Sequence, residues 1–173
     1  GDHGGGCGVR GTSDLLKTAE DDDAGGRIWG CRHLLDDTFM ATYGDGLSDV
    51  VFTELLGFHR HCGRLATITS VPLRSQYGTI EANEDGIIHD FREKPTLREH
   101  WINAGFFVMD KRIFDHWDGE NLERDVFPNL LPGRHLATYR HDGFFKSMDT
   151  YKDQQELEAM SAEGSLPWLR NAA

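Results

Sequence analysis

The chain has 173 residues, and its 18 lysines and arginines against 29 aspartates and glutamates give a formal net charge of −11. This length suits one domain, and so acidic a chain repels phosphate backbones, so we expect no nucleic-acid partner. No apolar run approaches the roughly 18 residues of a membrane span, and no secretory signal is visible. Three scattered cysteines predict no disulfide framework. We expect a cytoplasmic protein without membrane contact and with reduced thiols.

The amino-terminal segment, residues 1–26, is rich in glycine and aspartate and poor in large apolar side chains. Such a segment buries too little surface to offset the entropy that ordering costs. We expect it to be irregular, and we expect residues 27–173 to form an α/β domain.

From residue 27 onward, short β-prone runs alternate with segments of helical periodicity. A first strand over 38–43 stops at Gly44-Asp45-Gly46, and Ser48 is expected to cap a helix that ends near Gly63. Further strands are expected at 65–71, 77–81, 87–91, 102–109, 135–140 and 144–146. Further helices are expected at 113–117, 122–131 and 150–162, with Thr150 capping the last.

The order of these elements predicts the architecture of the sheet. Strands that alternate with helices favour a mostly parallel sheet. The runs 77–81 and 87–91 flank Glu84-Asp85-Gly86, which predicts a β-hairpin and adds an antiparallel part.

The first candidate site is Asp45, which lies between Gly44 and Gly46 at the carboxyl end of a predicted strand. Ligands of open α/β sheets collect outside such ends, and the flanking glycines allow a ligand to approach closely. A carboxylate in this position could bind Mg²⁺. The alternative is an ordinary Asp-Gly turn.

Two further candidates are polar groups next to the hairpin and within the following strand. Lys94 offers a point charge for a phosphate, and Glu93 could accept hydroxyl protons from a sugar; a solvated surface pair is the alternative. The Asn103 amide suits a pair of hydroxyls, and Gly105 inside an apolar strand indicates close approach by a ligand or another backbone.

Asp149 is a second carboxylate, at the junction of a late strand with the last helix. It could share a metal with Asp45, or it could cap the helix. His59-Arg60-His61 is a poor chelate because residues two apart on a helix face different ways. We interpret it as a solvated helix end.

Taken in order, these motifs resemble the sugar-1-phosphate nucleotidyltransferases, and within them the cytidylyltransferases that act on glucose 1-phosphate. The similarity covers residues 20 to 170. The stretches that carry it are Gly25-Gly26-Arg27, residues 39–50, Phe58-His59, Glu93-Lys94-Pro95, residues 101–108, residues 141–150 and residues 164–168.

The resemblance implies an α/β fold with a Rossmann-like, mixed nucleotidyltransferase sheet and a β-hairpin sugar-binding portion. It implies transfer of a nucleotidyl group from an NTP, here CTP, to a sugar 1-phosphate, here glucose 1-phosphate, with release of pyrophosphate. Mg²⁺ is the implied cofactor, the two substrates are the implied partners, and a homo-oligomer is a further expectation.

The resemblance also implies roles for single residues. Asp45 and Asp149 would hold Mg²⁺, Lys94 would bind the sugar phosphate, and Glu93 and Asn103 would bind sugar hydroxyls. Four glycines would lie close to substrate: Gly25 and Gly26 near the nucleobase, Gly78 near the sugar, and Gly44 beside Asp45.

One departure from the family pattern concerns the amino terminus. Family members begin with a strand and a loop of the type Gly-Gly-x-Gly-Thr-Arg-Leu that cradles the triphosphate, and nothing before residue 20 resembles it. We therefore expect the amino-terminal part of the fold to be missing, which would expose a sheet edge. The alternative function is a catalytically silent module that binds a sugar phosphate or serves in assembly.

Overall fold

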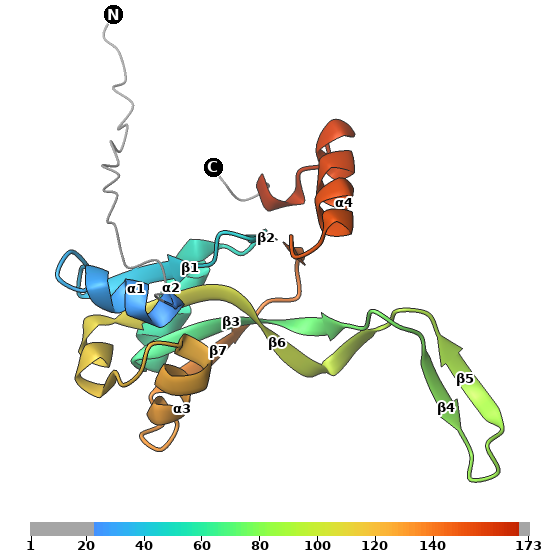
Figure 1. Ribbon diagram of the computed structural model, residues 1–173, viewed down its shortest axis with the longest axis horizontal. Helices are drawn as coiled ribbons and strands as arrows, with labels where there is room; N and C mark the ends of the chain where they lie inside the picture. Colours follow the sequence, from blue (N-terminus) through green and yellow to red (C-terminus); the bar gives the residue numbers. More distant parts are fainter. Residues whose placement is uncertain (1–22, 170–173) are drawn as a thin grey trace, which may run out of the picture.

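The computed structural model describes residues 23–169, and its centre is a four-stranded mixed sheet (Figure 1). The strand order is β1 (Thr38–Thr42), β6 (Thr96–Asp110), β3 (Ala66–Arg74), β7 (Leu136–Arg140). β1, β3 and β7 run in one direction, and β6 lies antiparallel between β1 and β3. The mixed sheet is confirmed. The expectation that it would be mostly parallel is wrong, because β6 pairs antiparallel with both β1 and β3, and only β3 and β7 pair in parallel.

The two faces of the sheet are covered by different helices. The buried run 104–109 of β6 is apolar throughout, as expected for a strand covered on both sides. On one face, Phe107 and Met109 pack with the helical segments α1 (Ala24–Cys31), η1 (Lys111–His116), η2 (Leu122–Val126) and α3 (Phe127–Leu130). On the other face lies α2 (Phe52–Cys62), which contacts β3, β6 and β7.

α1 begins within the segment that was expected to be irregular. Its first residue is Ala24, so residues 24–26 belong to the α/β domain rather than to the irregular segment. Residues 1–22, with Cys7, lie outside the described residues. Cys31 and Cys62 are free thiols.

α2 starts and ends for different reasons. Gly63 adopts a left-handed conformation with φ of 59° and ends the helix, as predicted. The predicted cap at Ser48 is wrong, because the N-cap is Val51 and Ser48 belongs to a short strand, β2 (Gly46–Ser48). The Ser48 hydroxyl donates instead to the carbonyl of Phe144, at 2.8 Å.

β2 forms a separate two-stranded ribbon with β8 (Phe145–Ser147), and this ribbon leads into α4 (Tyr151–Ala162). Thr150 caps α4 as predicted, in a reciprocal capping box with Asp153. The Lys146 side chain is only 17% exposed, and its ammonium bonds to Asp153 at 3.0 Å and to Glu156 at 2.7 Å. These contacts fix the start of α4 to the ribbon. After α4, a short 3₁₀ turn, η3 (Pro167–Leu169), ends the described chain.

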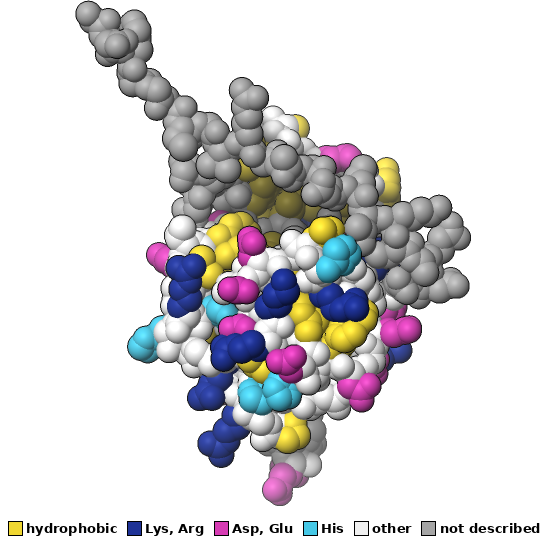
Figure 2. Space-filling model, turned by 90° about the vertical axis from the view of Figure 1, so that its left-hand side faces the viewer, with side chains coloured by type: hydrophobic (Ala, Val, Ile, Leu, Met, Phe, Trp, Pro, Cys, Tyr) yellow, Lys and Arg dark blue, Asp and Glu magenta, His cyan; other side chains and the backbone are white. Residues whose placement is uncertain are grey.

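The predicted hairpin is confirmed as β4 (Thr79–Ala82) and β5 (Ile88–Arg92), with Gly86 at a φ of +79° in its turn. It extends away from the sheet beyond the ends of β3 and β6 (Figure 1). At the opposite end of the molecule, basic, acidic and histidine side chains are interspersed with small apolar patches (Figure 2). Among the described residues, none of the helices has both the length and the apolar character that crossing a membrane requires.

His59 is buried, which corrects the interpretation of residues 59–61 as a solvated helix end. Only 4% of it is exposed, and its Nδ1 lies 2.9 Å from the Thr67 hydroxyl of β3. Burial lowers the pKa of the imidazole below the usual value for histidine, because the charged form is poorly solvated there.

This burial predicts how stability changes with pH. The unfolded chain takes up a proton at His59 at a higher pH than the folded chain, so stability is full above about pH 6.5 and is lost as the pH falls below it. We expect the free energy of unfolding, measured with urea at several pH values, to depend less on pH in His59→Asn. The exposed His61→Asn is the control, and an equal change in both variants would contradict the assignment.

Candidate functional site

The candidate site lies where β1 ends and the chain turns into β2. The Tyr43 amide donates to the Gly105 carbonyl at 3.2 Å, which continues the contact between β1 and β6. The Asp45 carbonyl then accepts from the Met148 amide at 2.8 Å. Met148 directly precedes Asp149, so the ribbon brings the two predicted metal ligands to the same end of β2 and β8. Both aspartates are exposed.

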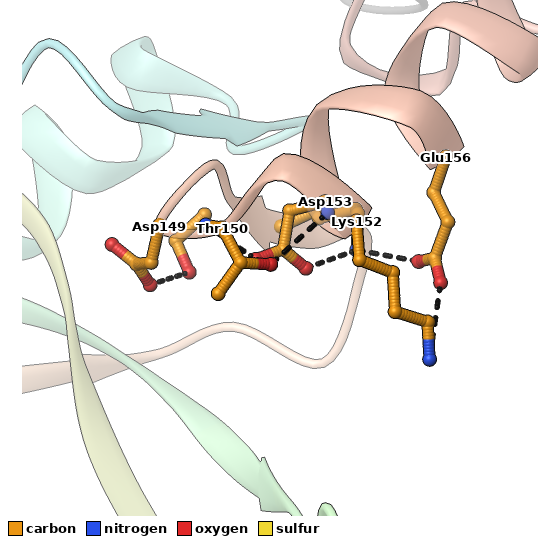
Figure 3. Close-up of polar contacts among 7 residues, drawn as sticks. Asp149, Thr150, Lys152, Asp153 and Glu156 are labelled. Carbon is orange, nitrogen blue, oxygen red and sulfur yellow. Dashed lines mark hydrogen bonds and ion pairs between the residues drawn. The ribbon is translucent and has the colours of Figure 1, made fainter.

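Asp149 does not cap α4. Thr150 and Asp153 form that cap, and Asp149 lies on the other side of Thr150 from Asp153 (Figure 3). Its carboxylate accepts a hydrogen bond from the Ser147 hydroxyl at 2.7 Å. The structure therefore removes the helix-cap alternative, and Ser147 orients a carboxylate that faces outward.

The two aspartates form a donor set that fits Mg²⁺. This hard cation takes one or two protein carboxylates and completes its shell with water and phosphate oxygens. Within residues 23–169, three or more His, Cys, Asp or Glu side chains are nowhere gathered around one point. In the described part of the chain, no third side chain of these types joins Asp45 and Asp149, and water or substrate oxygens could complete the shell.

A hydrogen-bonded network lies beside this site. The Tyr43 hydroxyl donates to Glu123 Oε1, and the Asn103 amide nitrogen donates to the same oxygen at 3.2 Å. The Asn103 amide oxygen accepts from the Gly105 backbone at 2.8 Å. Burial raises the pKa of the Tyr43 phenol, and the carboxylates of Glu123 and Asp45 raise it further, so Tyr43 stays protonated and donates. Asn103 thus has a fixed orientation.

The backbone conformation at Gly105 and the packing around it require a glycine at this position. Its φ is +75°, and a Cβ there would lie 2.8 Å from the ring of Tyr43. The sequence left open a ligand or another backbone as the group that approaches Gly105, and in the structure a side chain, the ring of Tyr43, lies against it. Because the Tyr43 ring lies against this glycine, the loop that carries Asp45 is held close to β6.

Sequence reasoning missed Glu123 and the role of Tyr43. Glu123 lies in η2, where Asn121 caps the first turn by accepting from the amides of Glu123 and Arg124. An asparagine before an apolar run is a readable helix start. Nothing in the sequence, however, indicates that this turn packs beside the end of β1.

A hollow of about 450 Å³ lies between α1 and the end of β1. Ala24 and Arg27 line it from the helix, and Thr42, Tyr43 and Gly44 line it from the strand. Its volume is within the range of small-molecule sites, and Gly44 places its edge next to Asp45.

Gly25 and Gly26, for which proximity to a nucleobase stays a prediction, both contact the protein backbone. The Gly26 amide donates to the Glu120 carbonyl at 2.9 Å. A Cβ at Gly25, which is buried, would lie 2.3 Å from the same oxygen. The nearest neighbours of the hollow in this stretch are Ala24 and Arg27, on either side of the two glycines.

This contact predicts a stability difference between two helical glycines. Gly25→Ala is expected to lower the free energy of unfolding by about 1–3 kcal/mol, because its methyl group has no space. Gly57→Ala, in α2 where nothing lies within 4 Å of the added carbon, is expected to raise it by about 0.5–1 kcal/mol. Urea titrations of both variants test this, and equal effects would contradict the packing described here.

Gly78, Glu93 and Lys94 form a second group, at the base of the hairpin. Lys94 has a φ of 47°, and its ammonium lies 3.7 Å from Glu93. A Cβ at Gly78 would lie 3.0 Å from the Phe91 ring and 3.1 Å from the Glu93 carboxylate. At 3.3 Å per residue, β6 separates Thr96 from Asn103 by roughly 23 Å. The structure therefore does not bring this group to Asp45 and Asp149.

Comparison with known proteins places this chain in a family. The family model described as "Nucleotidyl transferase" matches residues 11–134. The chain belongs to the nucleotidyl transferase family. The match begins nine residues before the region of resemblance seen in the sequence, and residues 11–22 lie outside the described residues.

Two relatives of this nucleotidyl transferase chain come from bacteria. It is 38% identical to the "Probable glucose-1-phosphate cytidylyltransferase" of Bacillus subtilis (strain 168) and 30% identical to the glucose-1-phosphate cytidylyltransferase of Salmonella typhi. Each alignment covers 89% of this chain and 61% of the relative. The chain therefore spans about three fifths of the length of these relatives.

The fold agrees with that of a solved structure. HddC from Yersinia pseudotuberculosis superposes with a TM-score of 0.61 at 17% identity, covering 86% of this chain and 66% of that one. At this identity the likeness concerns the fold alone. It supports the Rossmann-like, mixed nucleotidyltransferase sheet expected from the sequence.

Proposed function

We propose that the chain transfers a nucleotidyl group from an NTP to a sugar 1-phosphate, releasing pyrophosphate, with CTP and glucose 1-phosphate as the preferred substrates. The observation that carries this proposal is the hydrogen bond that holds Asp45 beside the residue preceding Asp149. The identity to two glucose-1-phosphate cytidylyltransferases supports the choice of base and sugar.

The chemistry requires charge neutralisation more than proton transfer. The attacking sugar phosphate is already ionised at neutral pH, so no general base is needed. Bound Mg²⁺ would neutralise phosphate charge and help to hold the in-line geometry. Asp45 and Asp149 would hold that ion, and Ser147 orients the second carboxylate.

Other residues of the chain would bind the organic parts of the substrates. The hollow beside Thr42 and Gly44 is large enough for a nucleoside. Asn103, fixed by Glu123 and the Gly105 amide, keeps one amide proton and one lone pair for sugar hydroxyls. Lys94 would reach the phosphate of a sugar 1-phosphate bound near Asp45 only if the hairpin bends towards β1. The register shifts in β3 between Ile68 and Ser70 and between Pro72 and Leu73 are where such a bend would occur.

The separation of Lys94 from Asp45 also favours a second candidate function, a module that binds a sugar phosphate without turnover. Pyrophosphate release with each of the four NTPs plus glucose 1-phosphate, with Mg²⁺ and with EDTA, distinguishes the two. We expect release with CTP that EDTA abolishes. Glucose 1-phosphate binding in calorimetry without release under any condition would overturn the enzymatic proposal and favour the module.

A further inference from the structure

The ribbon of β2 and β8, next to the two proposed metal ligands, is separate from the central sheet and lies to one side of it (Figure 1). Its pairing holds Asp45 close to Asp149, through the bond from the Met148 amide to the Asp45 carbonyl. Asn103, in contrast, lies in β6 of the central sheet. The attachment of the ribbon to the sheet therefore determines where the two carboxylates lie relative to the proposed sugar site.

A hydrogen-bonded pair, Asp49 and His141, attaches the ribbon to the sheet. His141 Nε2 lies 2.7 Å from Asp49 Oδ1 and donates to it, because a carboxylate only accepts. The same oxygen accepts from the Phe144 amide at 2.7 Å, and the His141 amide donates to the Ser70 carbonyl of β3 at 2.8 Å. Asp49 directly follows β2 and Phe144 directly precedes β8, so one carboxylate oxygen links both strands of the ribbon to the sheet.

A second attachment of the ribbon is apolar. Phe145 of β8 packs against a cluster of Val71, Ala104 and Phe106. Apolar packing has no preferred direction, so this contact holds the ribbon against the sheet without fixing its angle. A hydrogen bond is directional, and the Asp49–His141 pair supplies that constraint.

The Asp49–His141 pair is shielded from water and closely packed. The side chains of His141 and Asp49 are 13% and 18% exposed. A Cβ at Gly143 would overlap the Asp49 carboxylate and lie 2.6 Å from the His141 ring. The neighbouring ion pair of Asp142 with Arg98 is more than half exposed on both sides, so water screens it. Of these two polar contacts, the shielded one is costly to leave unmade.

We propose that His141 and Asp49 are positioning residues for nucleotidyl transfer, whose hydrogen bond holds the ribbon at the angle that aligns Asp45 and Asp149 with Asn103. The inference rests on the proposed function, which supplies the reaction. A misplacement of about 1 Å can lower a reaction rate by about 10²-fold. Loss of the pair therefore lowers the rate of the bound substrates more than their affinity. The ribbon still holds Asp45 close to Asp149, so the dependence on Mg²⁺ is unchanged.

Steady-state kinetics with CTP, glucose 1-phosphate and a Mg²⁺ titration test this inference. We expect His141→Leu to lower kcat by a factor of about 10–100 and to change each KM, and the half-saturating Mg²⁺ concentration, by less than about threefold. His141→Gln is expected to recover most of the loss, because its amide nitrogen can donate to Asp49 in place of Nε2. Asp142→Asn removes the exposed ion pair next to His141 and is expected to keep the wild-type kcat.

Amide hydrogen exchange gives a readout that does not depend on activity. We expect residues 144–149 to exchange faster in His141→Leu than in the wild type, with β3 and β6 unchanged. Asp142→Asn is expected to show no such difference. A wild-type chain without pyrophosphate release would count against the proposed function, and the exchange rates would still decide whether the pair holds the ribbon.

Three results overturn the inference. If His141→Leu is less stable in urea but keeps the wild-type kcat, the pair serves stability alone. If His141→Leu and His141→Gln lose kcat equally, the hydrogen bond is not what positions the ribbon. If residues 144–149 exchange at the wild-type rate in His141→Leu, the ribbon is held without the pair.

Discussion

Asp45→Asn is expected to lower the rate of pyrophosphate release from CTP and glucose 1-phosphate by a factor of about 10²–10³, the usual cost of losing one group that stabilises transition-state charge. The substitution removes one of two carboxylates that would hold the ion. It should not disturb the fold, because Met148 bonds to the backbone carbonyl of Asp45 and not to its side chain. Steady-state rates over a Mg²⁺ titration measure the effect.

The matched control for this variant is Asp115→Asn. Asp115 is an exposed aspartate in η1, away from the end of β1, and its substitution changes the net charge by the same amount. We expect it to retain the wild-type rate. Equal losses in both variants would show that Asp45 acts through general charge, and an unchanged Asp45→Asn rate would remove it from the site.

The largest expected loss of stability is that of Phe107→Ala, about 3–5 kcal/mol. Phe107 is 1% exposed in the buried last third of β6, and the centroid of its ring lies 5.5 Å from those of both Tyr43 and Phe127. Its removal leaves a cavity between the sheet and the helices. For a chain of this size we expect the melting temperature to fall by roughly 10–15 °C.

Ile102→Ala on the same strand is the control for Phe107→Ala. Ile102 is 37% exposed, so its truncation removes less buried surface and is expected to cost about 1 kcal/mol or less. Urea and thermal unfolding of both variants provide the comparison. Similar losses would contradict the assignment of Phe107 to the centre of the core.

Elements with strong local signals were predicted correctly from the sequence. Gly63 ends α2, Gly86 lies in the hairpin turn, and Thr150 caps α4, because each signal acts within a few residues. Ser48 failed as a cap because its partner is Phe144, far along the chain. Pairing between distant strands overrides the local preference of a serine for a helix cap, and no sequence pattern near that serine indicates the pairing.

The candidate site could be predicted only in part from the sequence. The motif order places Asp45 and Asp149 in the family pattern, and the structure brings their backbones together through Met148. Glu123 belongs to no motif, so only the packing of η2 beside β1 identifies it. The distance of Lys94 from Asp45 depends on the path of β6, which neither composition nor spacing contains.

The pairing of β2 with β8 limits how far the chain can be shortened. A deletion from the carboxyl terminus that passes residue 149 removes Asp149, one of the two proposed metal ligands. A deletion that passes residue 145 also removes the whole strand against which residues 46–48 lie. A shortened chain that keeps both proposed metal ligands must therefore keep β8, whereas α4 begins only after Asp149.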